Sequence, residues 1–123
     1  MKDNKKEFYV LAERNGDDVV YNIMRIVNDK EVGFVRVSYY KGEKIISISN
    51  LYVDPLLRGL GIGDKMLSEA IRYCNMHKDC KFIEMAVGKE KINIQEWYER
   101  RGFRYAYDLD DMNMLVFKKN NNE

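Results

Sequence analysis

The chain has 123 residues, and its 21 Lys and Arg against 20 Asp and Glu leave a formal net charge of +1. This length supports a single domain over residues 1–123 and is too short for two. A nearly neutral chain lacks the strongly basic surface that binds nucleic acid or an anionic membrane, so neither is expected as the main partner. No apolar run approaches the roughly 20 residues that span a bilayer, and residues 1–6 lead into no signal peptide. We therefore expect a cytoplasmic protein, disordered only at residues 1–6 and 118–123.

Two cysteines and one histidine lie close together in the sequence. Cys74 and Cys80 are separated by five residues, with His77 between them. Zinc sites usually need four ligands, often in two short-spaced pairs, so we expect no metal site. A reducing cytosol favours two buried thiols over a disulfide. His77 is expected at a helix C-terminus, where its polarity suits the negative end of the helix dipole, rather than as a catalytic base.

The first half of the chain is predicted to form four strands. Runs rich in Val, Ile, Phe and Tyr are separated by turn residues, at 8–13, 19–27, 32–40 and 45–53. Tight turns between them indicate an antiparallel meander. The fourth run is apolar on both faces in places, which favours a central position in the sheet.

The second half changes to helical periodicity. Apolar residues recur at three- and four-residue steps over 62–77 and again over 92–101, where Gly102 is a plausible left-handed cap. Short strands are predicted at 81–87, 103–107 and 114–117. The order of four strands, helix, strand, helix and two strands predicts an α+β fold with a mixed sheet, parallel across the strand–helix–strand unit.

The junction between the fourth strand and the first helix is the most informative segment. Pro55 ends the strand, and Gly59, Gly61 and Gly63 precede the helix, with Arg58 beside them. Glycines can adopt positive φ and allow a ligand to approach closely. Backbone N–H groups and the positive end of the helix dipole then form an anion site. The segment therefore predicts recognition of a phosphate or diphosphate.

Two common phosphate motifs do not fit this junction. A P-loop needs Gly-Lys-Ser/Thr at the helix start, where this chain has Gly63-Asp64-Lys65-Met66. A dinucleotide fingerprint would place its third glycine at position 64, where Asp64 stands. Glycines that only turn the chain would not explain three of them alternating beside an arginine.

A different pattern does match. Arg58-Gly59-Leu60-Gly61-Ile62-Gly63 resembles the Arg/Gln-x-x-Gly-x-Gly/Ala loop of the GNAT superfamily of N-acetyltransferases. Residues 97–103, with Tyr98 and Gly102-Phe103, resemble the family's second signature. The two motifs occur in the family's order and spacing, and the resemblance covers about residues 45–107. The resemblance implies an acyl-CoA N-acyltransferase-like fold of about seven strands and two main helices. It also implies that the fourth and fifth strands splay apart to admit the cofactor.

The resemblance further implies an activity. Acetyl-CoA would be the cosubstrate, with no metal, and the acetyl group would pass to a primary amine of a small molecule or protein by direct attack in a ternary complex. The chain would act as a monomer or a homodimer. The alternative is a regulatory module that binds acetyl-CoA or CoA without catalysis. A nucleic-acid-binding domain built on the Tyr-rich meander is a third hypothesis, which the near-zero charge disfavours.

Site residues follow from the resemblance position by position. The backbone of Leu51, Tyr52 and Val53 would bind the pantetheine arm and the thioester carbonyl, where strand-edge N–H groups can stabilise an oxyanion. Tyr98 would be the general acid that protonates the departing thiolate, although simple core filling is the alternative. The diphosphate would be held by Arg58, Gly59, Leu60, Gly61, Ile62 and Gly63.

The general base has no direct counterpart. Ala86 stands before Val87 where some family members place a carboxylate. Glu84 shares the strand face with Ala86 and is the candidate base acting through a water, with a solvated surface carboxylate as the alternative. The family's asparagine after the fifth strand is replaced by Lys91, with Asn93 nearby.

The acceptor site also departs from the family pattern. Family members usually insert two helices after the first strand, and here only residues 15–18 fill that place. The acceptor site is therefore open, or completed by a partner subunit or a large protein substrate. The acidic residues Asp108, Asp110 and Asp111 would attract a cationic amine, or they form a solvated turn.

Overall fold

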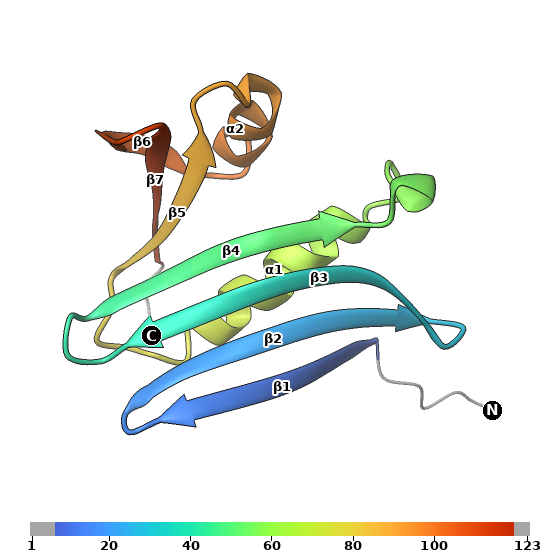
Figure 1. The fold of residues 1–123 in the computed structure, drawn as a ribbon, viewed down its shortest axis with the longest axis horizontal. Coiled ribbons are helices and arrows are strands. Elements are labelled where there is room, and N and C mark those ends of the chain that lie inside the picture. Colours follow the sequence, from blue (N-terminus) through green and yellow to red (C-terminus); the bar gives the residue numbers. More distant parts are fainter. Residues whose placement is uncertain (1–6, 120–123) are drawn as a thin grey trace.

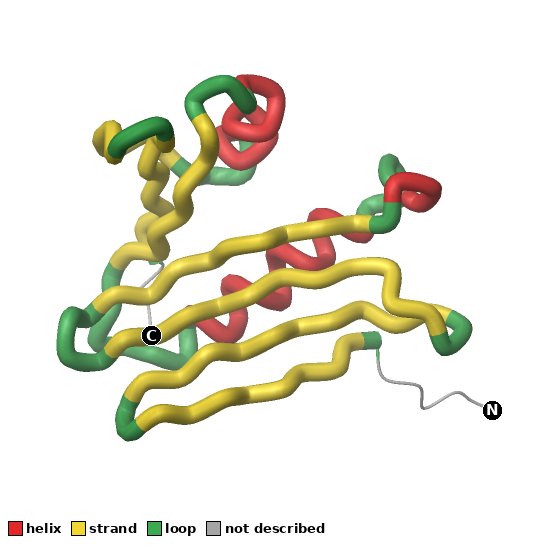
Figure 2. The backbone as a smooth tube through the Cα atoms, viewed as in Figure 1, coloured by secondary structure: helices red, strands yellow, loops and turns green. Residues whose placement is uncertain are grey.

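The computed structural model describes residues 7–119 and contains one seven-stranded mixed sheet in the order β1-β2-β3-β4-β5-β7-β6 (Figures 1 and 2). The predicted α+β class and the order of elements are confirmed. The elements, in chain order, are β1 (Phe8–Asn15), β2 (Asp18–Val27), β3 (Lys30–Tyr40), β4 (Ile45–Val53), a 3-10 helix (Pro55–Leu57), α1 (Ile62–Cys74), β5 (Phe82–Gly88), α2 (Ile92–Glu99), β6 (Arg104–Leu109) and β7 (Met112–Lys118).

Strands β1 to β4 form the antiparallel meander predicted from the turn residues. The β1–β2 hairpin is tight because Asn15 pairs with Asp18, which leaves Gly16 and Asp17 as the turn. Gly16 has a φ of 62°, a conformation that glycine adopts without strain. No helix lies between these two strands, in agreement with the sequence expectation.

Helix α1 packs across one face of the meander (Figure 1). Its apolar side chains recur at helical spacing and are buried, whereas its other face is polar and exposed. The strand residues beneath it alternate inward along β2, β3 and β4. This core includes Ile23, Val35, Val37, Ile46, Ile48, Met66, Leu67, Ala70 and Cys74.

Strands β4 and β5 separate along their length. Their parallel ladder contains only Ile46 opposite Ile83 and Ser47 opposite Glu84, although β4 continues to Val53. Figure 1 shows the two strands diverging, with α2 following the far end of β5. The splay expected from the family resemblance is therefore present.

A bulge in β4 reverses its side-chain alternation before the strand ends. Asn50 has a φ of 59°, and the register with β3 shifts between Ser49 and Tyr52. Ile46 and Ile48 face α1 before the bulge, and Leu51 packs against the same core after it. A Cβ built on Gly63 of α1 would lie 3.8 Å from Val53 Cγ2. The bulge thus directs the last residues of β4 toward the start of α1.

The C-terminal end of α1 differs from the prediction. The helix stops at Cys74 rather than His77, and the Lys119 amine donates hydrogen bonds to the carbonyls of Cys74 (3.0 Å) and His77 (2.7 Å). Lys118 ends β7 and Lys119 is buried, so the expectation of disorder at these two residues is wrong. A lysine from a distant segment thus adds a second donor to two carbonyls, at the helix end and just after it, that also accept backbone N–H groups. Residues 1–6 and 120–123 lie outside the described residues.

His77 has a packing role. Its Nε2 lies 2.8 Å from the Tyr21 hydroxyl, and its ring stacks on Tyr39 with centroids 3.9 Å apart. Burial lowers the pKa of His77, which favours the neutral ring. Cys74 and Cys80 are buried free thiols, as predicted. Over residues 7–119, no helix is long and apolar enough to cross a membrane, and no three His, Cys, Asp or Glu side chains are grouped to hold a metal.

Candidate functional site

A cavity of about 610 Å³ lies between the end of β4 and α2. It is bounded by the end of β4, the glycine loop, the first turn of α1 and one side of α2. Pockets of this size accept small ligands and cofactors. Its lining residues are Leu51, Tyr52, Val53, Arg58, Gly59, Gly61, Gly63, Asp64, Asn93, Ile94, Trp97, Tyr98 and Arg101.

The glycine loop has the backbone geometry that its sequence predicts. Gly59 and Gly61 have φ values of 87° and 83°, and a Cβ on either would meet nothing within 4 Å, so space beside both is open to a ligand. Gly61 is the N-cap of α1, and it has no side chain to occupy the free N–H groups of the first turn. These amides and the helix dipole favour an anion here.

The chain turns sharply between β4 and this loop. Asp54 accepts a hydrogen bond from the Leu56 amide at 2.9 Å, and Pro55 starts the 3-10 helix. Arg58 then returns to the strand end, where its Nε donates to the Val53 carbonyl at 3.2 Å. This contact holds a permanent positive charge in the cavity wall.

The end of β4 contributes a free strand edge. Val53 pairs with Gly33 and Tyr52 with Phe34 on the β3 side, but the ladder with β5 ends at Ser47. The backbone of residues 51–53 on the other side therefore has no strand partner and faces the cavity. Such an edge can hydrogen-bond an extended ligand as though it were an added strand.

Tyr98 occupies the wall contributed by α2. The residue is 7% exposed, and its ring packs edge-on against Trp97 and Phe103, with ring centroids at 5.0 and 5.7 Å. Burial raises the pKa of Tyr98 to about 12. The phenol is therefore a neutral hydrogen-bond donor at physiological pH, beside an open cavity.

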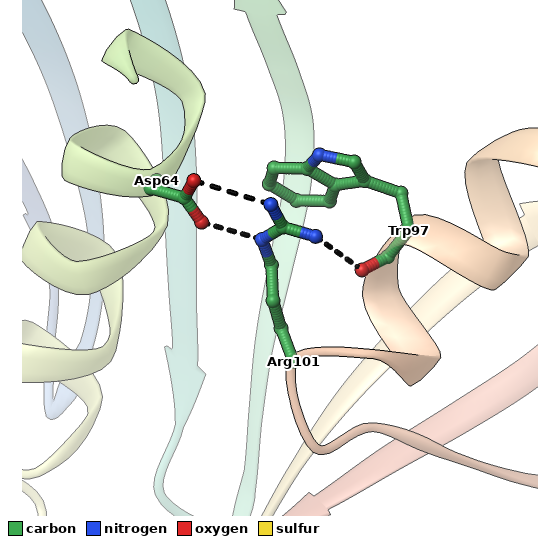
Figure 3. A network of polar contacts seen from close by, with 3 residues as sticks. All are labelled: Asp64, Trp97 and Arg101. Atoms are coloured by element: carbon green, nitrogen blue, oxygen red, sulfur yellow. Dashed lines mark hydrogen bonds and ion pairs between the residues drawn. The ribbon is translucent and has the colours of Figure 1, made fainter.

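One ion pair spans the cavity wall between α1 and α2. Asp64 is the one carboxylate among the lining residues, and the Arg101 guanidinium binds both of its oxygens (Figure 3). Hydrogen bonding to Arg101 lowers the pKa of Asp64. With Arg58 the lining carries two cationic side chains against one anionic side chain, a balance that favours an anionic ligand.

Most of the predicted site residues meet in this one cavity. Leu60 is 70% exposed and Ile62 packs on the core, and neither is among the lining residues. Glu84 pairs with Ser47 at the closed end of the splay, four residues or about 13 Å along β4 from Leu51. Its action as a base through a water stays a prediction. The predicted residues that line the cavity are Leu51, Tyr52, Val53, Arg58, Gly59, Gly61, Gly63 and Tyr98.

Five lining residues were not predicted as site residues: Asp64, Asn93, Ile94, Trp97 and Arg101. Asn93 was noted only as a neighbour of Lys91. Asp64 and Arg101 are 37 residues apart in the chain, and no local pattern links them. Gly63 could have indicated a close neighbour such as Trp97, because a glycine inside a helix often leaves room for a side chain from another element.

The acidic turn between β6 and β7 lies outside this lining. Asp108 forms an ion pair with the Lys89 amine at 3.1 Å and accepts a hydrogen bond from the Tyr105 hydroxyl. Asp110 has a φ of 56°, and the Asp111 carbonyl accepts from the Lys89 amide. These contacts favour the turn interpretation of the acidic cluster.

Comparisons with known proteins agree with this geometry. A family model described as the GNAT acetyltransferase domain matches residues 4–105. An uncharacterized N-acetyltransferase of Methanocaldococcus jannaschii is 35% identical over 82 residues, covering 63% of this chain and 36% of that protein. Another, from Archaeoglobus fulgidus, is 29% identical over 108 residues, covering 84% of this chain and 71% of that protein. The chain thus spans about a third of the first relative's length and most of the second's.

The fold is also similar to that of solved structures. The PaiA N-acetyltransferase of Thermoplasma acidophilum, in complex with coenzyme A, superposes with a TM-score of 0.69 at 16% identity. The match covers 84% of this chain and 62% of that one. Because the family model spans most of the chain and the fold has the family's splayed sheet, the protein belongs to the GNAT acetyltransferase family.

Proposed function

We propose that this chain is an N-acetyltransferase that binds acetyl-CoA in the cavity and transfers its acetyl group to a primary amine by direct attack in a ternary complex. The observation that carries the proposal is the single cavity shared by the glycine loop, the free edge of β4 and Tyr98. Family membership and the coenzyme A bound by the Thermoplasma protein of the same fold support it.

The lining suits the different parts of this cosubstrate. Gly59, Gly61 and Arg58 offer amides and a positive charge to the diphosphate. Residues 51–53 offer strand hydrogen bonds to the amide groups of the pantetheine arm. Ile94 and Trp97 supply apolar surface beside that path.

The side chains around the cavity also suit the chemistry. Bound acetyl-CoA supplies an activated acetyl thioester. An N–H group on the β4 edge can donate to the thioester oxygen, and the protonated Tyr98 hydroxyl can donate to the sulfur as it leaves. The acceptor nitrogen forms the new C–N bond as the C–S bond breaks, the nitrogen's proton passes to water, and the solvent returns a proton to the Tyr98 phenolate. Since Arg101 holds the only lining carboxylate, the amine arrives neutral or deprotonates through solvent.

Coenzyme A binding tests the site assignment. Gly61→Ala places a side chain at a φ of 83° inside the cavity, and Gly16→Ala is the matched control because it does the same at 62° in a remote turn. Both variants carry similar backbone strain. We expect calorimetry to show coenzyme A binding weakened by about tenfold or more in Gly61→Ala alone. Equal affinity in both variants would remove the glycine loop from the site.

A regulatory module that binds the cosubstrate without catalysis is the second candidate. The observation that favours it is the missing base, since Asp64 is paired with Arg101 and no other carboxylate lines the cavity. Acetyl transfer from acetyl-CoA to a panel of polyamines, amino sugars and lysine peptides separates the two candidates. Tight binding with no transfer to any member of the panel would favour the module.

A further inference from the structure

The guanidinium of Arg101, one of the residues that line the cavity, is held by Asp64 and Trp97 (Figure 3). Its Nε and Nη2 donate to the two Asp64 oxygens, the second at 3.1 Å, and its Nη1 donates to the Trp97 carbonyl at 2.9 Å. The guanidinium carbon also lies 3.7 Å from the centre of the Trp97 ring. Bidentate pairing and stacking restrict a guanidinium in both position and orientation.

This contact links the start of α1 to the segment after α2, beside the place where Gly63 meets Trp97. Asp64 lies in the first turn of α1, immediately after the glycine loop. Arg101 follows α2 directly, three residues after Tyr98. At the other end of the splay the two halves of the sheet are joined through Ile46 and Ser47 of β4. The Asp64–Arg101 pair therefore closes the open end of the same gap.

Helix α2 is short and depends on tertiary contacts to hold its position. It contains eight residues, fewer than the roughly 12 that an isolated helix needs, and no side chain caps its N-terminus. Tyr98 is its only buried residue. Near its middle, Gln95 accepts a hydrogen bond from the Asn113 side chain at 2.8 Å. The contacts of Arg101 therefore add to the packing of Trp97 and Tyr98 in fixing the helix end that carries Tyr98.

The Asp64–Arg101 pair contributes too little to folding stability for stabilisation to be its main role. The Asp64 side chain is 55% exposed and that of Arg101 is 26% exposed, and ion pairs this open to solvent contribute little to stability. A carboxylate in the first turn of α1 also competes with any anion for the same amides. Pairing with Arg101 offsets the negative charge of Asp64 and connects α1 to the end of α2.

We propose that Asp64 and Arg101 are positioning residues that set the separation between the diphosphate loop and the Tyr98 hydroxyl. The proposal rests on the proposed function. The diphosphate and the sulfur of coenzyme A belong to one molecule, so the loop and the hydroxyl engage both only when they are correctly spaced. Turnover depends on that spacing more steeply than binding does, because a small misplacement at the reacting atoms lowers the rate.

The test compares Asp64→Asn, Arg101→Gln and the double variant with wild type. Glu69→Gln is the matched control, because Glu69 pairs with Arg72 at 2.6 Å on the same helix and lines no part of this cavity. Acetyl-CoA is used with the best amine of the panel, and kcat, KM and the dissociation constant of coenzyme A are measured. We expect each single variant to lower kcat by about tenfold with affinity changed less than about threefold, and the double variant to be no worse.

Other outcomes would overturn the proposal in distinct ways. If Arg101→Gln weakens coenzyme A binding while Asp64→Asn strengthens it, Arg101 is a phosphate ligand instead. If both single variants behave like Glu69→Gln, the pair has no role in positioning. A wild-type chain that binds no coenzyme A contradicts the proposed function itself. Fluorescence emission from Trp97, the only tryptophan, then tests separately whether the pair positions α2. An indole environment that both single variants leave unchanged shows that the pair does not position α2.

Discussion

Gly63 of α1 and Trp97 of α2 meet at the wall of the cavity: a Cβ on Gly63 would lie 3.4 Å from Cζ2 of the indole. This is the near limit of ordinary van der Waals contact, so any larger side chain at position 63 overlaps the ring. The third glycine of the loop thus differs in role from Gly59 and Gly61. Gly63 provides room for Trp97, whereas Gly59 and Gly61 adopt positive φ.

Gly63→Val should move Trp97 and with it the α2 wall. Overpacking of this kind forces neighbouring side chains to move, so we expect the emission of Trp97 to shift and coenzyme A affinity to fall by about tenfold. Gly42→Val is the control, because a Cβ there meets nothing within 4 Å. Calorimetry and fluorescence measure both effects. An unchanged affinity in Gly63→Val would show that the contact does not shape the cavity.

Tyr98→Phe should lower turnover more than it lowers affinity. The change removes one hydroxyl from a ring that packs against Trp97 and Phe103, and the packing of the ring is kept. A general acid contributes about 10²-fold or more to a rate, so we expect kcat to fall by at least that factor with a similar KM for acetyl-CoA. Steady-state kinetics with the best amine provides the measurement. A rate equal to that of wild type would remove Tyr98 from the chemistry.

Tyr98 should also affect stability at alkaline pH. Burial raises its pKa to about 12, whereas an unfolded tyrosine titrates near about 10. Between these pH values the unfolded chain has lost a proton that the folded chain keeps. The contribution of neutral Tyr98 to the free energy of unfolding is therefore full below about pH 10 and is lost as the pH rises toward 12. The loss amounts to about 2 kcal/mol. Urea unfolding at pH 9 and pH 11.5 should show a smaller fall for Tyr98→Phe than for wild type, and equal falls would contradict the assignment.

Lys119 should stabilise the fold through the end of α1. Its buried amine donates to the carbonyls of Cys74 and His77 at 3.0 and 2.7 Å. Lys119→Met removes this donor and leaves each carbonyl its backbone N–H partner, and we expect the free energy of unfolding to fall by about 1 kcal/mol. Lys118→Met is the control, because Lys118 is exposed at the end of β7. Denaturant midpoints that shift equally in both variants would show that the hydrogen bonds contribute little.

Local sequence signals predicted the order of elements and much of the cavity. Alternation, helical spacing and turn residues located every strand and both main helices, because these features reflect burial over a few neighbouring residues. The glycine loop was recognisable because positive φ, as at Gly59 and Gly61, is favoured by that residue type.

Features that depend on distant segments could not be predicted in this way. The bulge at Asn50 is set by the pairing of β3 with β4, and it determines which side of β4 faces α1. Arg101 meets Asp64 across 37 residues, and Lys119 reaches Cys74 across 45. Such contacts exist only once the sheet has assembled, so no local pattern encodes them.

A crystal structure of the chain with acetyl-CoA tests the central claim most directly. We expect the diphosphate to lie on the amides of the Gly59–Gly61 loop, the pantetheine arm along β4 at residues 51–53, and the sulfur within hydrogen-bonding distance of the Tyr98 hydroxyl. Acetyl-CoA bound elsewhere, or bound in the cavity with its sulfur remote from Tyr98, would contradict the account.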